Sequence, residues 1–445
     1  MIPLELEEII QRFDEIGAEI YLVGGCVRDY LLGTSPKDYD MTTSLKPDEI
    51  LELFSDYTCF TIGKKFGTIG LLTGIGIIEI TTFRVDGLYL DNRKPQEVHF
   101  TQNIKEDLAR RDFTMNAMAY HPQKGLVDPF FGQEALEKKI ITTVGDPDKR
   151  FKEDGLRILR ALRFMGQLNF SICPKVEESM KRQASLIQNL SPERIRDEME
   201  KILLQDKPSL CLKKLVDLGL MEYIFPELIA TVDFDQRSPY HSKTLFEHII
   251  CVVDHSPKKL SLRLAALFHD VMKPQTLSID DETGKGHFFG HDSLGAEEAT
   301  RILKKYHEPK SLVQEVSTLI KEHMKVHDVM TDKALRRQIK RVGQDLILDL
   351  YDLMAADMSC TYEARPMEWI MERKERVKKL LEEGIIEKKS LAFSGKDIIK
   401  LGIKEGPLIG KLLKELEEIV LDDPSKNKEE FLKKYIKERV EEMDL

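Results

Sequence analysis

The chain has 445 residues, more than one domain usually contains, so we expect about two to four domains. Apolar residues make up 42% of it, which is ample for packed cores, and no apolar run approaches the ~20 residues of a membrane span. The formal net charge of −10 is unusual for a protein that binds RNA and, taken alone, argues against such a partner.

The cysteines indicate a reducing compartment. The chain has 6 of them, scattered without a CxxC pair, and its N-terminus lacks a basic region followed by an apolar stretch. This pattern predicts free thiols and a cytoplasmic location. The residues concerned are Cys26, Cys59, Cys173, Cys211, Cys251 and Cys360.

The segment from Tyr21 to Thr43 is the first in the chain whose residues indicate a chemical function. Tyr21–Val23 is short, apolar and β-prone, and a helix-like run follows the glycine pair Gly24–Gly25. Glycines at this turn would let the backbone approach a phosphate closely. We expect Arg28 in the first turn of the helix, where its guanidinium and the backbone N–H groups can share triphosphate oxygens.

Two aspartates follow the turn at Gly33–Pro36. Asp38, Tyr39 and Asp40 should lie on a second strand, where side-chain alternation directs both carboxylates to one face. Two such carboxylates can share divalent metals, and paired metals stabilise both the attacking and the leaving oxygen in nucleotidyl transfer. A DxD sequence alone is more often a solvated turn. The glycine turn and Arg28 before it favour the metal site.

The segment Asp107–Asn116 places arginines and an aspartate before an amphipathic stretch. One interpretation is a salt-bridged helix start. The other is a triphosphate contact, for which Arg111 is our candidate.

After Pro147 we predict a helix with charged residues at intervals of three. Asp154, Arg157, Arg160 and Arg163 follow one another at this spacing, so neighbours should lie one turn apart. Such residues usually form a solvated face with weak surface ion pairs. The segment Phe151–Leu190 also has a local excess of basic residues, which could face a phosphate backbone.

Asp154 and Arg157 together could select a nucleobase. Cytosine and adenine both offer an amine donor beside a ring-nitrogen acceptor, whereas uracil and guanine offer a carbonyl beside an N–H. A carboxylate with a guanidinium would therefore accept CTP and ATP and reject UTP and GTP, at about 1–3 kcal/mol for each mispaired group. We expect Arg160 and Arg163 to contact sugar or triphosphate.

Five ordered motifs resemble the class II tRNA nucleotidyltransferases, the CCA-adding enzymes, whose opening motif bacterial poly(A) polymerases share. They are GGCVRDYLLG with KDYDMTT, RVDGLYLDNRKP, EDLARRDFTMNAMA, EDGLRILRALRF and SPERIRDEMEKIL. The resemblance implies a tRNA 3′ end with its acceptor and elbow region as partner, ATP and CTP as substrates, and neither DNA nor a membrane as partner.

The resemblance also implies roles for single residues. Asp38 and Asp40 would bind Mg²⁺ as the catalytic pair, while Asp154 and Arg157 would serve as an amino-acid template in place of a nucleic acid. The triphosphate would be held by Gly25, Arg28 and Arg111.

Arg84–Phe100 reads as a long polar loop between two strand-like runs, and long loops are often functional. In enzymes that resemble this one, a flexible loop here is needed to switch from C to A addition, and enzymes that add only CC look shortened. The chain retains the loop, which disfavours a CC-only enzyme and a poly(A) polymerase. Full CCA addition and addition of A alone both stay open.

A second set of metal-ligand residues begins after His241. Its order of histidines and aspartates resembles the HD phosphohydrolase domains, which implies phosphatase or 2′,3′-cyclic phosphodiesterase activity. A lone helical histidine is usually structural, but the full set suits a divalent metal, Mg, Mn, Ni or Fe, that activates water against a phosphoester. The set comprises His248, His269, Asp270, His291, His323 and Asp357.

We expect an α+β protein whose β-prone runs stop near Thr143 and give way to helical periodicity. The expected parts are a mixed-sheet nucleotidyltransferase head at 1–140, a helical nucleotide-recognition and neck region at 141–230, an HD-like metal-binding domain at 231–370 and a helical tRNA-binding tail at 371–445. In the tail, Phe393–Asp422 predicts two amphipathic helices around a glycine turn. They either pack together or, by resemblance, face the tRNA elbow.

These features predict a template-independent tRNA nucleotidyltransferase that adds C and A. The alternatives are an A-adding enzyme, a poly(A) polymerase and, from another class, a metal-dependent phosphohydrolase whose head only binds RNA. A non-catalytic RNA-binding module is least favoured, because binding alone requires neither metal carboxylates nor an HD set.

Overall fold

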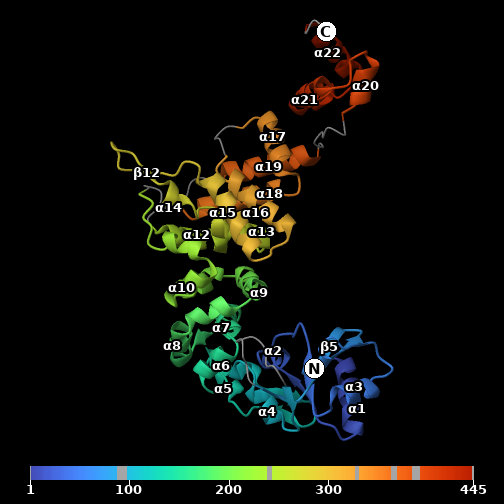
Figure 1. The fold of residues 1–445 in the computed structure, drawn as a ribbon, viewed down its shortest axis with the longest axis vertical. Helices are drawn as coiled ribbons and strands as arrows, with labels where there is room; N and C mark the ends of the chain where they lie inside the picture. The colour runs from blue at the N-terminus through green and yellow to red at the C-terminus, as the bar shows by residue number, and fades with distance from the viewer. Residues whose placement is uncertain are drawn as a thin grey trace. The chain divides into compact units, whose positions relative to one another are not determined.

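The computed structural model describes residues 2–87, 98–237, 243–325, 330–361, 368–382 and 391–442. The chain forms two compact units, Met1–Ile229 and Ala230–Leu445, each with its own buried core. In Figure 1 the first unit runs from blue to green and the second from green to red.

The first unit is built on a seven-stranded mixed sheet with strand order β3-β4-β5-β2-β1-β8-β9. β2 and β5 pair in parallel, whereas the other neighbours pair antiparallel. The parallel register places Asp40 opposite Glu79. The strands are β1 (Ile20–Val23), β2 (Asp40–Thr43), β3 (Cys59–Phe60), β4 (Thr68–Thr73), β5 (Gly76–Thr82), β8 (Ala119–His121) and β9 (Gly125–Val127).

Short helices and a hairpin surround this sheet. α1 (Leu4–Glu15) buries one face, Leu6, Ile9, Ile10 and Phe13, because these apolar residues recur at helical spacing. β6 (Arg84–Asp86) pairs with β7 (Val98–Phe100), and the loop between them lies outside the described residues at 88–97. The other elements are α2 (Gly25–Leu31), α3 (Pro47–Leu53), η1 (Lys64–Phe66), α4 (Ile104–Ala109), η2 (Thr114–Asn116) and α5 (Gly132–Glu137).

A helical part completes the first unit. Several of its helices begin with proline, whose fixed φ and missing N–H suit the first helical position. The Phe113 ring meets Phe164 edge-on, with centroids 5.8 Å apart, and so packs these helices against the sheet. They are α6 (Pro147–Glu153), α7 (Leu156–Leu168), α8 (Pro174–Arg182), α9 (Pro192–Leu203), α10 (Pro208–Asp217) and α11 (Met221–Ile224); β10 (Ile140–Ile141) pairs with β11 (Ser171–Ile172).

The second unit is a helical bundle followed by a helical tail (Figure 1). The bundle comprises α12 (Leu245–His255), α13 (Leu260–Phe268), α14 (Lys273–Thr276), α15 (His291–Lys305), α16 (Lys310–Glu322), α17 (Asp332–Val342), α18 (Ile347–Ser359) and α19 (Glu368–Glu382), with a hairpin of β12 (Ser278–Ile279) and β13 (Gly286–His287). The tail comprises α20 (Gly395–Lys400), α21 (Pro407–Asp422) and α22 (Glu429–Glu442), which share one apolar cluster that includes Ile398, Leu412 and Leu432.

The expected α+β class, a mixed-sheet head followed by helices, is confirmed. Three local predictions are wrong. β2 begins at Asp40, so Asp38 lies in the bend before the strand; the charged helix is interrupted at Asp154; and short strands continue beyond Thr143. The four-part division of the chain stays a prediction. Among the described helices, none has the length and apolar content that a membrane span requires.

Candidate functional sites

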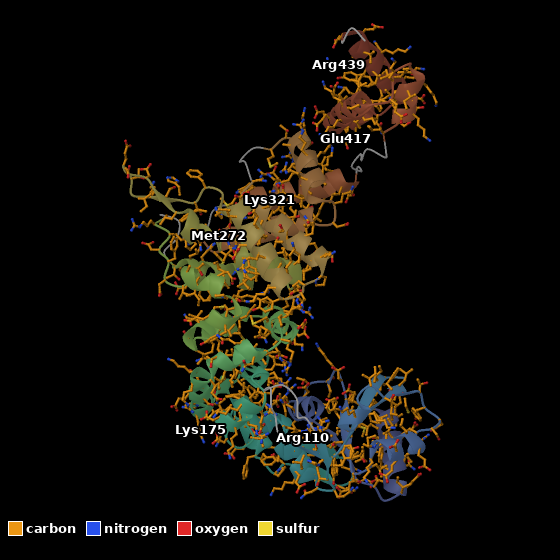
Figure 2. All side chains as sticks on the ribbon, in the orientation of Figure 1. Arg110, Lys175, Met272, Lys321, Glu417 and Arg439 are labelled. Atoms are coloured by element: carbon orange, nitrogen blue, oxygen red, sulfur yellow. A yellow bond between two sulfur atoms is a disulfide. The ribbon has the colours of Figure 1, made fainter. Side chains whose placement is uncertain are left out.

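A cleft of about 960 Å³ opens in the first unit beside strands β3 to β5. Its other walls come from the segment after α4, where Figure 2 labels Arg110, and from the start of α7 and α9. Its charged lining consists mainly of guanidinium groups, which suit a polyanion such as a triphosphate. The charged residues are Glu79, Arg84, Arg110, Arg111, Asp112, Asp154, Arg157, Arg160 and Arg194.

The predicted site residues fall into two groups. Arg111, Asp154, Arg157 and Arg160 line the cleft, and their contact with a ligand stays a prediction. The remaining ones lie outside its lining, although Asp40 is the strand partner of the lining residue Glu79. They are Gly25, Arg28, Asp38, Asp40 and Arg163.

Carboxylates gather where β2 and β5 begin to pair. Asp40 is exposed at the first position of β2, and Asp38 precedes it by two residues. Desolvation raises the pKa of Asp40, and the Glu79 and Asp38 carboxylates raise it further against the opposing charge of Arg111. Mutual repulsion of this kind is relieved by a divalent cation, and a donor set of carboxylate oxygens suits Mg²⁺. Glu79 was not identified from the sequence, although an acid within the apolar run IIEITT was a signal.

The glycine turn is shaped around Arg111. Gly24 has a φ of +76°, and a Cβ at this position would lie 3.1 Å from Nη1 of Arg111. The positive φ favours glycine, and a Cβ here would push the Arg111 guanidinium aside by a few tenths of an ångström. Arg28 is buried, and its guanidinium donates to Asn116 Oδ1 at 2.9 Å and to Asp29 Oδ1 at 2.7 Å.

Asp154 and Arg157 face the same cleft but do not pair with each other. Asp154 has an extended backbone between α6 and α7, accepts the N–H of Leu156 at 3.0 Å and binds Arg194 at 2.7 Å. Arg157 pairs with Glu153 and donates to the Arg110 carbonyl at 3.1 Å. The prediction that they lie one turn apart on a single helix is therefore wrong, because Asp154 is extended and α7 begins only after Gly155. Arg194 lay in a noted motif but was assigned no role.

Ion pairs with buried carboxylates fix the other two arginines of α7. Arg160 binds Asp112 at 2.6 Å, and Arg163 binds Glu198 at 2.7 Å. The Phe164 ring lies within 5.4 Å of both guanidinium carbons and of that of Arg28. Burial alone would raise the pKa of Asp112, but Arg160, the Phe113 N–H and Asn116 outweigh it and hold that pKa at about 2.

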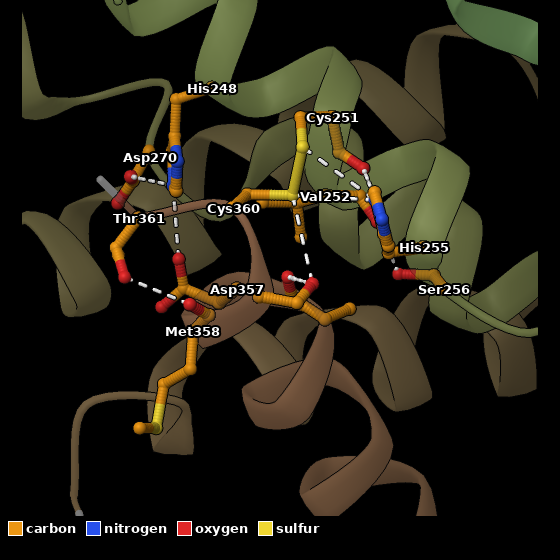
Figure 3. Close-up of a disulfide and its surroundings, with 12 residues drawn as sticks. His248, Cys251, Val252, His255, Ser256, Asp270, Asp357, Met358, Cys360 and Thr361 are labelled. Carbon is orange, nitrogen blue, oxygen red and sulfur yellow. Dashed lines mark hydrogen bonds and ion pairs between the residues drawn. A yellow bond between two sulfur atoms is a disulfide. The ribbon is translucent and has the colours of Figure 1, made fainter. Parts of the chain in front are cut away.

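The predicted HD residues converge in the second unit. His248 comes from α12, His269 and Asp270 directly follow α13, His291 begins α15, His323 follows α16 and Asp357 lies on α18. The Nε2 atoms of His269 and His291 lie 3.1 and 3.3 Å from Asp270. Figure 3 shows His248, whose Nε2 lies 2.9 Å from Asp357 Oδ1. Two triads of these residues, one containing Asp357 and one Asp270, have the geometry of a metal site.

The backbone fixes the ring orientation of three of these histidines. Nδ1 of His269, His291 and His323 each bonds the carbonyl three residues earlier, so Nδ1 carries the proton and Nε2 faces the centre. The three Nε2 atoms are buried and have no hydrogen-bond partner among the described residues. This tautomer and orientation are those of metal-ligating histidines.

Charge in this centre is partly balanced by a lysine. Lys273, three residues after Asp270, lies 2.7 Å from its Oδ2. Burial would raise the pKa of Asp270, but His269 and Lys273 lower it well below its ordinary value. Burial and the adjacent His269 lower the pKa of His323 to about 4, so its ring is neutral near pH 7 and can ligate. Lys273 was not identified from the sequence.

A disulfide joins Cys251 of α12 to Cys360, directly after α18 (Figure 3). The prediction that all cysteines are thiols is therefore wrong for this pair. A sequence separation of 109 residues gives no local signal of the pairing. Cys26, Cys59, Cys173 and Cys211 are not in disulfides.

Comparison with known proteins identifies the family. Residues 20–142 match the poly A polymerase head domain, 169–231 the "Probable RNA and SrmB- binding site of polymerase A" and 240–359 the HD domain. The CCA-adding enzyme of Staphylococcus haemolyticus is 32% identical over 437 residues, 98% of each chain. The chain belongs to the CCA-adding enzyme family.

Other CCA-adding enzymes are also similar to this chain in sequence or in fold. The Geobacillus stearothermophilus enzyme is 31% identical over 97% of this chain and 96% of its own. The crystal structure of the Bacillus stearothermophilus CCA-adding enzyme in complex with CTP superposes with a TM-score of 0.77 at 28% identity, covering 100% of this chain and 99% of that one. The Thermotoga maritima enzyme, complexed with tRNA_CCA, shares the fold with a TM-score of 0.56 at 22% identity over 98% and 95%.

The Asp112–Arg160 pair makes stability pH-dependent. The pKa of Asp112 is about 2 in the folded chain, below its ordinary 3.8, so its contribution is present above about pH 5 and lost as the pH falls toward 2. We expect Asp112→Asn to lower stability by about 2 kcal/mol at pH 7, a melting-temperature deficit of roughly 4–8 °C. Calorimetry should show this deficit shrinking between pH 5 and 3.5. A deficit that is constant with pH would contradict the assignment, and the exposed Asp197→Asn should show none.

Proposed function

We propose that this member of the CCA-adding enzyme family adds C and A from CTP and ATP to the 3′ end of tRNA in a Mg²⁺-dependent, template-independent reaction. The observation that carries the proposal is the guanidinium-lined cleft beside the Asp40–Glu79 pair. Membership over nearly the whole chain supports it, as do relatives described with CTP and with tRNA_CCA.

Asp38 and Asp40, joined by Glu79, are the candidate ligands of Mg²⁺. When bound, Mg²⁺ would polarise the α-phosphate and stabilise the attacking and leaving oxygens. Asp40 and Glu79 are held in register by the parallel strand pair, which fixes the spacing of their carboxylates. Asp38 lies in a bend and can adjust its position.

Arg111 and Arg110 are the candidate triphosphate contacts, with Gly24 and Gly25 leaving room for the phosphates. Arg111 both lines the cleft and approaches Gly24 closely. Arg28 is buried and donates to Asn116, so its role is to stabilise this side of the cleft. Arg160 lines the cleft and is the candidate contact for the sugar or a phosphate. Arg163 acts indirectly, through its ion pair with Glu198 and its position over the Phe164 ring.

Asp154 and Arg157 are the candidate base-reading pair, and Arg194 is the candidate group that orients Asp154. The 2.7 Å contact with Arg194 and the Leu156 N–H hold both carboxylate oxygens of Asp154. Arg157 is similarly fixed by Glu153. A fixed carboxylate and a fixed guanidinium at one cleft distinguish the amine edge of C and A from the carbonyl edge of U and G.

The finer assignments are proposals as well. We propose that the tail at 371–445 contacts tRNA and that the chain has four functional parts, at 1–140, 141–230, 231–370 and 371–445. We also propose a cytoplasmic location and no DNA or membrane partner. Addition of A alone is the nearest alternative, because the same carboxylates and base-reading pair serve both reactions.

A tRNA extension assay tests this function. We expect purified protein with CTP, ATP and Mg²⁺ to extend a transcript ending at the discriminator base by CCA and then stop. A second transcript ends in CC, and extension of this transcript alone would mean an A-adding enzyme. Addition of long A tails would mean a poly(A) polymerase. Asp40→Asn should lower the rate by at least about 10³-fold, because the metal loses a charged ligand. No incorporation by the unmodified protein on any transcript would refute the proposal.

Base selection rests on Asp154. We expect Asp154→Ala to lower kcat/KM for CTP and ATP by about 10- to 100-fold and to reduce discrimination against UTP and GTP, since a hydrogen-bond partner of the base is lost. The measurement is kcat/KM for the four nucleotides with matched transcripts. Asp197→Ala, at an exposed position in the same unit, is the control. Unchanged discrimination in Asp154→Ala would contradict this role.

We further propose that the HD centre binds a divalent metal, Mg, Mn, Ni or Fe, and hydrolyses a phosphoester such as a phosphate monoester or a 2′,3′-cyclic phosphate. The supporting observation is the set of inward-facing Nε2 atoms around Asp270. When bound, the metal would activate a water molecule. The chain's own residues orient the ligands through backbone carbonyls and balance the Asp270 charge through Lys273.

Asp270→Asn separates the two activities. We expect it to abolish metal-dependent hydrolysis of 2′,3′-cyclic AMP and p-nitrophenyl phosphate while nucleotide addition stays within about twofold, because the two centres belong to different units. Hydrolysis is followed after dialysis against each metal. Asp292→Asn, a half-buried acid next to His291, is the matched control. Hydrolysis retained in Asp270→Asn would assign the activity elsewhere.

A further inference from the structure

The Cys251–Cys360 disulfide lies one helical turn from two HD residues. Cys251 follows His248 by three residues, and Cys360 follows Asp357 by three. Residues at this spacing lie on one helix face, so the cross-link and the His248–Asp357 contact join the same two segments side by side (Figure 3). The loop that the bond closes also contains His269, Asp270, His291 and His323.

An imidazole lies against both sulfurs. Nδ1 of His255 is 3.6 Å from Sγ of Cys251 and 3.5 Å from Sγ of Cys360. It is also 2.9 Å from the Cys251 carbonyl, which only accepts, so this nitrogen carries a proton. An N–H beside two sulfurs stabilises whichever sulfur is released as a thiolate. His255 is exposed and Cys251 is partly exposed, whereas Cys360 is buried.

We propose that Cys251 and Cys360 form a redox-active pair that controls the metal affinity of the HD centre. The inference rests on the metal-binding function proposed above for that centre. Oxidised, the pair holds α12 and α18 together and keeps His248 beside Asp357. Reduced, the two segments separate more readily and the ligand set loses its fixed geometry. Disulfides in reducing compartments are characteristically transient and sensing, which suits this pair.

The opening step is a thiol–disulfide exchange with a dithiol. The reductant thiolate attacks Sγ of the more accessible Cys251, the Cys251–Cys360 bond breaks, and Cys360 leaves as a thiolate beside the His255 N–H. The second thiol of the reductant then attacks the mixed disulfide, releases Cys251 and closes its own disulfide. The protein pair gains two electrons and two protons, which the dithiol supplies; diamide or oxidised glutathione reverses the reaction.

The first test maps the bond in the full-length protein. Diamide-treated protein should yield a peptide cross-linked through Cys251 and Cys360, and dithiothreitol should convert both to alkylatable thiols. His255→Phe should slow this reduction by at least about threefold, because the thiolate loses its donor. No cross-linked peptide after oxidation would overturn the proposal. An unchanged reduction rate in His255→Phe would overturn the role of the imidazole.

The second test measures Mn²⁺ binding by electron paramagnetic resonance. An Asp38→Asn/Asp40→Asn background removes two candidate head ligands, and subtraction of the same protein carrying Asp270→Asn isolates the HD centre. We expect oxidised protein to bind Mn²⁺ about tenfold more tightly than protein reduced and freed of dithiothreitol, the size of effect typical of groups that orient metal ligands. Cys251→Ser/Cys360→Ser should bind like the reduced protein and ignore diamide. Cys173→Ser, at a helix N-cap that serine suits, should respond like the unsubstituted protein.

The outcomes separate this inference from the function on which it rests. Equal affinity in both redox states, with the cross-link confirmed, would overturn the redox control and leave the metal centre standing. Absence of Asp270-dependent binding in either state would refute the metal centre and the inference together, whatever the peptide map shows. Reduced protein that binds one further Zn²⁺, lost in Cys251→Ser, would replace redox control with a thiolate metal site.

Discussion

The pairing of buried opposite charges is the constraint on which the candidate active site depends. Arginines beside the cleft would repel one another and would resist burial if they stood alone. Asp112 binds Arg160, Glu198 binds Arg163, and each pair links α7 to another part of the first unit. Removal of one member of such a pair leaves the other charge without compensation, which destabilises the fold. The cleft can present guanidinium groups to a triphosphate because their positions are already fixed by carboxylates.

The HD centre also contains a buried charge that must be compensated, but its carboxylate is not paired with an arginine. Asp270 is buried among histidine rings, where an isolated carboxylate would be costly. Lys273 supplies one positive charge at 2.7 Å, and the imidazole Nε2 atoms leave room for a second cation. His323, with a pKa of about 4, is neutral near pH 7 and offers a lone pair rather than a charge. These features are the ones expected of the metal site proposed above, in which a metal ion would complete the charge balance that the side chains begin.

Local patterns allowed much of this to be predicted from the sequence. The glycine turn and the strand at Asp40 follow from short local patterns, whereas the HD set was identified because its order of histidines and aspartates resembles that of HD domains. The errors concern contacts between distant segments. Asp154 has an extended backbone that breaks the helix and lets it reach Arg194, Glu79 meets Asp40 only through the parallel strand pair, and Cys360 meets Cys251 across 109 residues. Linear spacing carries no information on such pairings, because they follow from how the elements pack.

Net charge is also a poor predictor, because it does not show where in the folded chain the charges lie. A chain of −10 argues against RNA as a partner if charge is treated as uniform, yet most charged side chains of the cleft are arginines. Attraction of a polyanion depends on the potential within about one Debye length, ~8–10 Å, of the binding surface. Acidic residues elsewhere are screened over that distance and instead oppose self-association. An acidic protein can therefore hold a nucleotide and an RNA end, provided that its arginines are concentrated at one cleft and each is oriented by a carboxylate behind it.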